Sequence, residues 1–246
     1  MVDQPPPALM SGPVVFAHRG NAIPGDAPAH ALNPRERERH RLQNHPHRRD
    51  TYLLGRLLWR SGAASFCATE ELVMPDVAGL PASGRPEIEG QPFGCALTHT
   101  DGLQLAAFHR GAVGLDAEHA RRRVPWRRLA QRWFSREETL WLSEHDSPEA
   151  AFLLLWTLKE AWVKATERGL ADNLQALSRL PGAGVDRFLL DTDCSRWRAA
   201  TALVDGFRVS ILWRDGGMPA WRDVPVPGEP ASAWRDTEWT RLELSS

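Results

Sequence analysis

The most informative stretch of the chain is residues 148–168, PEAAFLLLWTLKEAWVKATER. Ser147 and Pro148 are typical of an N-cap and a first helical position, and Gly169 is typical of the residue that ends a helix. Apolar residues occupy most positions in between, so the stretch predicts a largely buried helix. Charges inside such a helix are costly without partners, which makes Glu160 and the two lysines beside it candidate functional residues.

Lysine is almost absent from this chain. Of its 30 basic residues only Lys159 and Lys164 are lysine, and the rest are arginine. The two lysines lie on either side of Glu160. An ammonium is a compact point charge and a guanidinium is a planar fork, so they differ in a narrow anionic site. The alternatives are chance placement and an ordinary Glu160–Lys164 surface pair, which would contribute only ~0.3–0.5 kcal/mol.

The pattern around this helix predicts an α+β fold in which helix followed by sheet occurs twice. Leucines at helical spacing predict a long helix over residues 48–66, after a short one that begins at Asn33-Pro34. Asp-Gly pairs at 101–102 and 205–206 are typical of hairpin turns, and the proline-rich residues 75–92 predict a loop. The tryptophans of the last 30 residues predict a packed tail. The predicted strands are 14–17, 93–98, 103–108, 112–116, 197–204 and 207–213.

Two carboxylates end one of these strands. Asp116 and Glu118 are two positions apart, so their side chains point to the same face of the strand. Two neighbouring acids repel each other unless a cation holds them, and hard oxygen ligands suit Mg²⁺. A strand-end turn with two solvated acids is the alternative interpretation.

Two further polar sites each have two interpretations when only their neighbours in the sequence are considered. Ser135 and Glu138 have the spacing of a capping box, which could be their whole role. His99, between Thr98 and Thr100, is predicted to follow a strand, where it would either donate to a phosphate or be an ordinary loop residue.

The chain carries three motifs in this order: Val-Gly-Leu-Asp-Ala-Glu at 113–118, Phe-Ser-Arg-Glu-Glu at 134–138 and Trp-Thr-Leu-Lys-Glu-Ala-Trp-Val-Lys at 156–164. Together they resemble the motifs of the surfactin-synthetase-activating type of 4′-phosphopantetheinyl transferases. Gly84-Arg85-Pro86 and Thr98-His99-Thr100 are similar to two weaker motifs of that family. The resemblance covers about residues 33–213.

The resemblance implies a pseudo-dimer of two similar lobes with the active site in the cleft between them. Residues 1–112 would form the lobe that contacts the 3′-phosphate and adenine of coenzyme A, and residues 113–246 the lobe with the metal and catalytic motifs. Family members transfer the 4′-phosphopantetheine group of coenzyme A to a serine of an apo acyl or peptidyl carrier protein and release 3′,5′-ADP.

The resemblance also implies a magnesium site and a general base. Asp116, Glu118 and Glu160 would hold Mg²⁺ against the pyrophosphate, where the ion neutralises charge on the leaving group. Glu138 would position a metal-bound water or serve the serine, and Glu160 is the alternative general base.

The residues expected to bind coenzyme A are mostly basic. The position where the family often carries an arginine for the 3′-phosphate is Thr51 here, so Arg48 or Arg49 is expected to reach that phosphate instead. His99 would hold a phosphate and Arg85 the adenine, while the two lysines would contact phosphate and pantetheine. The full expected set is Arg39, Arg48, Arg49, Arg85, Pro86, Thr98, His99, Lys159 and Lys164.

Composition excludes several other classes. A net charge of −1 does not fit a uniformly basic nucleic-acid-binding protein. No stretch reaches the roughly 18 apolar residues of a membrane span, and the first residues lack the pattern of a secretion signal. Cys67, Cys95 and Cys194 have neither a CxxC spacing nor an even number, which indicates a reducing cytoplasm and no thiolate zinc site. A cytoplasmic monomer is therefore expected.

Two alternative functions stay open at this point. A Mg²⁺-dependent phosphodiesterase could use the same carboxylates with water as the nucleophile, and it would release 3′,5′-ADP without a carrier protein. A non-catalytic module that binds coenzyme A or a carrier would bind without magnesium-dependent turnover.

We expect Lys164→Arg to lower turnover by about tenfold or more, or about 1.4 kcal/mol, because a guanidinium does not fit where the compact ammonium does. The melting temperature should change little. The control is Arg128→Lys in the arginine-rich run that follows residue 120, which should be silent in a transfer assay. Full activity of Lys164→Arg would mean that the two lysines are a coincidence of composition.

Overall fold

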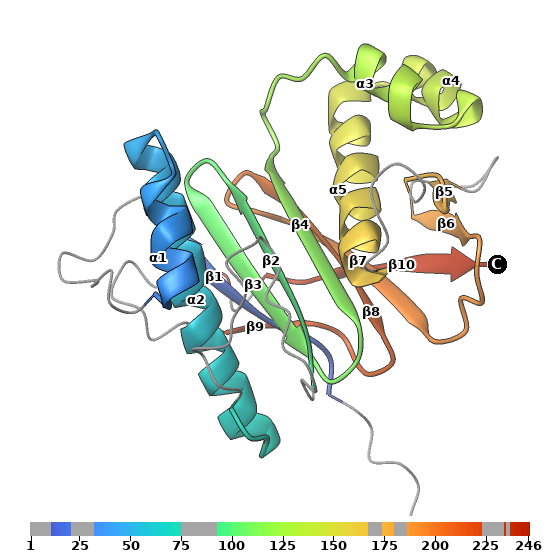
Figure 1. The fold of residues 1–246 in the computed structure, drawn as a ribbon. Helices are drawn as coiled ribbons and strands as arrows, with labels where there is room; N and C mark the ends of the chain where they lie inside the picture. Colours follow the sequence, from blue (N-terminus) through green and yellow to red (C-terminus); the bar gives the residue numbers. More distant parts are fainter. Residues whose placement is uncertain are drawn as a thin grey trace, which may run out of the picture.

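The computed structural model describes residues 11–20, 32–74, 93–166, 174–179, 186–222, 234 and 237–246. These residues form five helices and ten strands (Figure 1). The helices are α1 (Pro34–Arg41), α2 (Pro46–Glu70), α3 (Trp126–Trp133), α4 (Arg136–Glu144) and α5 (Pro148–Thr166). The strands are β1 (Val14–Arg19), β2 (Gly94–Thr100), β3 (Leu103–His109), β4 (Val113–His119), β5 (Leu177–Arg179), β6 (Arg187–Leu190), β7 (Trp197–Val204), β8 (Phe207–Arg214), β9 (Ala220–Arg222) and β10 (Thr240–Ser245).

Two sheets, each covered by one long helix, make up the described part of the chain (Figure 1). The first sheet has the strand order β2-β3-β1-β9 and lies against α2, and the second has the order β4-β8-β7-β10-β6-β5 and lies against α5. The predicted α+β pseudo-dimer is confirmed in this arrangement. No described helix is both long enough and apolar enough to cross a bilayer.

Most elements near the site follow from local sequence signals. The long leucine-rich helix, the hairpin turns at 101–102 and 205–206 and the six predicted strands are confirmed, with ends that differ by a few residues. One difference matters, because His99 lies within β2 and does not follow it. The predicted loop at 75–92 and the predicted helix end at Gly169 lie outside the described residues.

Capping boxes start two of the helices. The Asn33 side chain accepts the backbone N–H of Glu36, whose carboxylate accepts the N–H of Asn33, and together they start α1. Ser135 and Glu138 make the same reciprocal bonds at the start of α4. Each box satisfies N–H groups that have no partner inside the helix.

A hydrophobic core continues between the two sheets. In β1, Val14 and Phe16 face the cluster under α2, whereas Val15 and Ala17 face a middle cluster that includes residues of β4, β7 and β8. Both faces of the first sheet are therefore buried, and the two lobes share the middle cluster.

The C-terminal region contributes to both sheets. Strand β9 pairs in parallel with β1 in the first sheet, and β10 lies between β7 and β6 in the second. Trp221, Trp234 and Trp239 pack on the middle cluster, with the rings of Trp221 and Trp239 stacked at 4.6 Å. The packed tail is confirmed for these tryptophans. By sequence β9 belongs to the predicted C-terminal lobe, but by pairing it belongs to the first sheet.

Strand β4 and helix α5 approach each other closely at Gly114. A Cβ at this position would lie 1.9 Å from the carbonyl oxygen of Ala161 and 2.5 Å from the amide nitrogen of Ala165. Both atoms belong to the backbone, so no side chain can rotate away to make room. The glycine thus allows α5 to lie directly against the strand that carries Asp116 and Glu118.

Gly114→Ala should lower the free energy of unfolding by about 3 kcal/mol or more, because the added methyl pushes α5 away from β4. Chemical denaturation measures this change. The control is Gly102→Ala, where the glycine has a φ of +77° and nothing within 4 Å of a new Cβ. That variant should lose only the ~1–2 kcal/mol of left-handed backbone strain. Equal losses in the two variants would contradict the close contact.

Candidate active site

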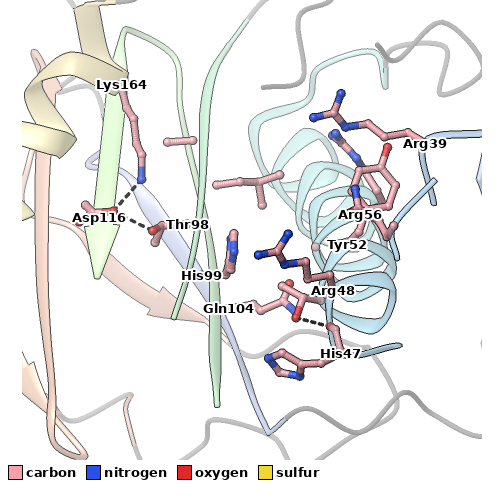
Figure 2. A pocket seen from close by; sticks show the side chains of 15 residues that line it. Arg39, His47, Arg48, Tyr52, Arg56, Thr98, His99, Gln104, Asp116 and Lys164 are labelled. Carbon is pink, nitrogen blue, oxygen red and sulfur yellow. Dashed lines mark hydrogen bonds and ion pairs between the residues drawn. The ribbon is translucent and has the colours of Figure 1, made fainter. Parts of the chain in front are cut away.

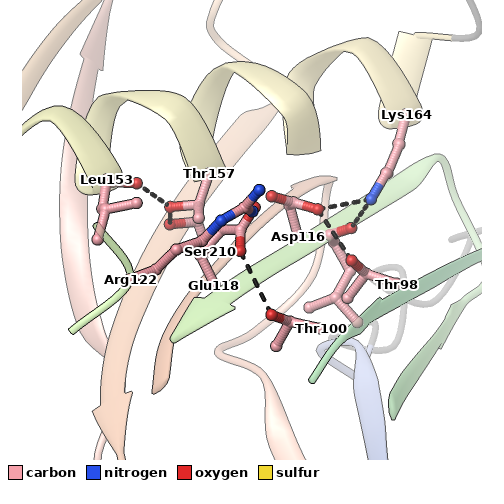
Figure 3. Close-up of polar contacts among 10 residues, drawn as sticks. Thr98, Thr100, Asp116, Glu118, Arg122, Leu153, Thr157, Lys164 and Ser210 are labelled. Atoms are coloured by element: carbon pink, nitrogen blue, oxygen red, sulfur yellow. Dashed lines mark hydrogen bonds and ion pairs between the residues drawn. The ribbon is translucent and has the colours of Figure 1, made fainter. Parts of the chain in front are cut away.

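The carboxylates of β4 meet hydroxyls of β2 where the two sheets touch (Figure 3). Thr98 donates its hydroxyl to Asp116 Oδ1 at 2.8 Å, and Thr100 donates to Glu118 Oε2 at 3.3 Å. Alternation along both strands places the two pairs on one face, as the spacing predicts. A site built from both sheets therefore forms around Asp116.

Each of these carboxylates also has a cationic partner. Lys164 Nζ lies 2.7 Å from Asp116 Oδ1 and donates to the carbonyl oxygen of Leu115 at 3.0 Å (Figure 3). Arg122 forms an ion pair with Glu118. The negative charge of the pair is thus balanced by one side chain from α5 and one from the loop after β4.

Glu160 lies in the electrostatic field of the same acids. Burial raises the pKa of its carboxyl group, the charges of Asp116 and Glu118 raise it further, and the nearby Lys164 ammonium opposes the shift. The three carboxylates therefore repel one another, and a nearby cation would relieve that repulsion.

The geometry tests this fit to a metal ion. Among the described residues, no three His, Cys, Asp or Glu side chains lie close enough to form a ligand group. Lys164 instead places a cation between a carboxylate and a carbonyl oxygen, which are the atoms that a hard metal ion prefers. The oxygen atoms of Asp116 and Leu115 are thus of the type that suits Mg²⁺, and the Lys164 ammonium supplies the positive charge beside them.

A cavity of 850 Å³ opens from Asp116 toward α2 (Figure 2). Its walls come from α1, α2, β2 and β3 of the first lobe and from β4 and α5 of the second, as a cleft between lobes requires. Six of the residues expected from the sequence line it: Arg39, Arg48, Thr98, His99, Asp116 and Lys164.

The cavity is predominantly cationic. Within the described residues, no carboxylate forms an ion pair with Arg39 or Arg48, which lie on the α2 side in Figure 2. Across the cavity, partial desolvation of its ring and the Lys164 ammonium lower the pKa of His99. Arginine side chains without carboxylate partners are typical of sites that bind phosphate groups.

Some expected residues are not brought into the cavity lining. Arg49 is not a lining residue, and its Nε donates at 2.7 Å to the carbonyl oxygen of Gln43, which does line the cavity. Glu118 and Glu160 stand beside the cavity near Asp116 and do not line it. Arg85 and Pro86 lie outside the described residues.

The expected roles of Lys159 and Glu138 require correction. Lys159 is fully buried, with Nζ 3.1 Å from Glu138 Oε1 and 5.1 Å from the centroid of the Phe134 ring. Its ammonium also donates to the carbonyl oxygens of Leu174 and Leu177. The pair joins α5 to α4 and to the start of β5, so Lys159 is not placed to contact phosphate.

Glu138 is equally enclosed. Its carboxylate accepts the N–H groups of Ser135 and Arg179 as well as the Lys159 ammonium, and the residue is 2% exposed. It therefore has no access to a metal-bound water or to a substrate serine. The sequence already indicated that Lys159 lies apart from the other polar residues of α5, because helical spacing places Thr157, Glu160 and Lys164 on one face and Lys159 off it.

Sequence reasoning missed several cavity residues. His47, Tyr52 and Arg56 of α2 line the cavity, as does Gln104 of β3. The sequence signal for the α2 residues was the set of polar positions between the leucines of residues 48–66. Those positions indicated only the face of the helix that is not packed in the core.

Comparisons with known proteins identify the family of the chain. The sequence profile described as the 4′-phosphopantetheinyl transferase superfamily matches residues 112–212. The 4′-phosphopantetheinyl transferase AcpT of Salmonella typhi is 35% identical over 140 residues, which cover 52% of this chain and 72% of that protein. The chain belongs to the 4′-phosphopantetheinyl transferase superfamily.

Two other matches are more distant. The putative 4′-phosphopantetheinyl transferase slr0495 of Synechocystis is 26% identical over 145 residues, covering 53% of this chain and 58% of that protein. The structure of Thermotoga maritima holo-[acyl-carrier-protein] synthase matches with a TM-score of 0.34 and 22% identity, covering 43% of this chain and 64% of that chain. The profile match of this superfamily contains Asp116, Glu118, Glu160 and Lys164.

The two lysines of α5 should behave differently when truncated. Lys159→Met leaves Glu138 buried without its cation, so we expect a loss of about 3–5 kcal/mol in the free energy of unfolding. Lys164→Met, at a partly exposed side chain, should cost less than about 1 kcal/mol of stability and should strongly reduce transfer activity. Denaturation and activity measured on both variants check this; equal stabilities would contradict the separate roles.

Proposed function

We propose that this protein transfers the 4′-phosphopantetheine group of coenzyme A to a serine of an apo acyl or peptidyl carrier protein and releases 3′,5′-ADP. Membership of the superfamily supports the reaction class. The observation that carries the proposal for this chain is the cationic cavity that leads from Arg39 and Arg48 to Asp116 and Lys164. Its two ends match a ligand with phosphate groups at separate places.

The two ends of the cavity have different tasks in this proposal. Arg39 and Arg48 take the 3′-phosphate end of coenzyme A, since their guanidinium groups can bind phosphate oxygens in pairs. Lys164 lies at the other end, where its ammonium can turn from Asp116 toward the pyrophosphate. His99, in the wall between them, is placed to contact a phosphate.

Asp116, Glu118 and Glu160 are the residues we assign to Mg²⁺. When bound, the ion would supply positive charge to the leaving pyrophosphate oxygen. The threonines of β2 hold the first two carboxylates in place through their hydroxyls. Thr98 and Thr100 are thus orienting residues for the acids in this proposal.

The transfer exchanges one phosphorus–oxygen bond for another. The serine oxygen forms a bond to the phosphorus that carries pantetheine, and the bond from that phosphorus to the oxygen of 3′,5′-ADP breaks. The serine proton leaves to a carboxylate. We assign this role to Glu160, which lies near Asp116 and Lys164, while Glu138 is enclosed around Lys159.

The cytoplasmic location and monomeric state belong to the same proposal, as does the absence of a nucleic-acid or membrane partner. They rest on the composition and charge of the chain.

Mass spectrometry of several apo carrier proteins, incubated with the enzyme, coenzyme A and Mg²⁺, tests the proposal. A gain of one phosphopantetheine mass on a carrier, with 3′,5′-ADP released only in its presence, is the expected result. Release of 3′,5′-ADP without any carrier would indicate a phosphodiesterase, and binding of coenzyme A without turnover would indicate a binding module.

Arg48 and Arg49 should differ in their effect on the 3′-phosphate. Each charge-assisted phosphate contact contributes roughly 1.5–3 kcal/mol, so the protein should prefer coenzyme A over 3′-dephospho-coenzyme A by about tenfold or more. Arg48→Ala should remove much of this preference. Arg49→Ala should not, because Arg49 does not line the cavity and its Nε is bonded to the carbonyl oxygen of Gln43. Kinetics with both substrates measure the ratio, and equal losses would contradict the assignment.

Glu160→Gln should separate the metal site from the fold. Because folding raises the pKa of this carboxyl, stability falls as the pH rises from the ordinary pKa of a glutamate to the raised one, and the loss is complete above it. At mildly alkaline pH without Mg²⁺, the variant should therefore melt at or above the temperature of the unmodified protein. Mg²⁺ should raise the melting temperature of the unmodified protein only, and less so as the pH falls. A variant stabilised equally by Mg²⁺ would contradict the site.

A further inference from the structure

A buried carboxylate lies behind the α2 wall of the cavity. Glu36 is 0% exposed, and its Oε2 accepts the backbone N–H of Asn33 at 2.9 Å and a hydrogen bond from Arg60 Nη2 at 2.5 Å. Its Oε1 lies 3.4 Å from Arg56 Nε. One carboxylate is therefore shared by two guanidinium groups, and the formal charges of these three side chains sum to +1.

The two arginines differ in what else they contact. Arg56 lines the cavity, and its guanidinium carbon lies 5.0 Å from the centroid of the Tyr52 ring, which also lines the cavity (Figure 2). Arg60, one helical turn further along α2, bonds to Glu36 and to the carbonyl oxygen of Arg56 and does not line the cavity. Only Arg56 combines the ion pair with a place in the wall.

Glu36 also controls the start of α1. It is the third helical residue of the capping box with Asn33, and three residues later the same helix carries Arg39, which lines the cavity. A capping box sets where a helix begins and hence which residues face a neighbour. A single buried carboxylate thus orients Arg39 through α1 and Arg56 through the ion pair.

We propose that Glu36 is a positioning residue for coenzyme A, and that Arg56 binds the phosphate-bearing nucleotide end directly. This inference rests on the proposed function, which supplies the ligand. If the Glu36 cluster only joined α1 to α2, it would not need to lie beside the cavity. Its excess positive charge, the Tyr52 ring and the adjacent Arg39 together form a wall suited to an anionic, aromatic ligand.

Arg56→Met and Arg60→Met form a matched pair for the test. Both remove one guanidinium from Glu36 on the same face of α2, so both should lower the melting temperature. Calorimetric titration with coenzyme A and steady-state transfer kinetics are measured for each. Arg56→Met should raise the Kd and KM for coenzyme A by about tenfold with kcat within about twofold, whereas Arg60→Met should change Kd by less than about twofold.

Glu36→Gln extends the test to the positioning residue itself. It should raise the KM for coenzyme A as Arg56→Met does and leave kcat nearly unchanged. Equal Kd values for the two arginine variants would overturn the inference and assign the cluster to stability alone; this comparison also decides the matter if Glu36→Gln does not fold. If the unmodified protein bound coenzyme A without transferring its phosphopantetheine group, the proposed function would be overturned. The Kd comparison would still test whether Arg56 binds coenzyme A.

Discussion

The close contact between α5 and β4 at Gly114 is the constraint on which the site depends. Because a side chain at this position would overlap the backbone of α5, only glycine lets the helix lie directly on the strand. Two residues along β4, Asp116 then comes within ion-pair distance of Lys164, and Glu160 comes within the field of both acids. The second contact, between hydroxyls of β2 and the same carboxylates, adds the first lobe to the site.

The two lysines of α5 show how strongly helix rotation decides the role of a residue. Lys164 shares its face with Glu160 and reaches Asp116, whereas Lys159 points into the packing between α4 and β5. Each ammonium contacts a carboxylate and a backbone carbonyl oxygen. For Lys159 these contacts lie inside the packing, and for Lys164 they lie at the cavity.

The cavity also shows how a protein of nearly zero net charge presents a cationic surface to an anionic ligand. Arg39 and Arg48 line the wall without carboxylate partners among the described residues, and Arg56 is held in the wall by the buried Glu36. Burying a carboxylate is costly unless it is paired and hydrogen-bonded. Here Arg60 and the backbone N–H of Asn33 hydrogen-bond one oxygen of Glu36, and Arg56 forms an ion pair with the other. Charged groups therefore lie behind the cavity wall, at Glu36, as well as on its surface.

The sequence by itself determined the α+β class, the helices, the hairpins and the acids of the site, because caps, turns and periodicity act between residues close in the chain. Asp116 and Glu118 were recognisable from alternation, and Glu160 and Lys164 from helical spacing. The tertiary structure decided what depends on distant residues: the pairing of β9 with β1, the burial of Lys159 against Glu138 and the entry of Arg56 into the cavity wall. Local patterns show which face a residue occupies, but only packing shows what covers that face.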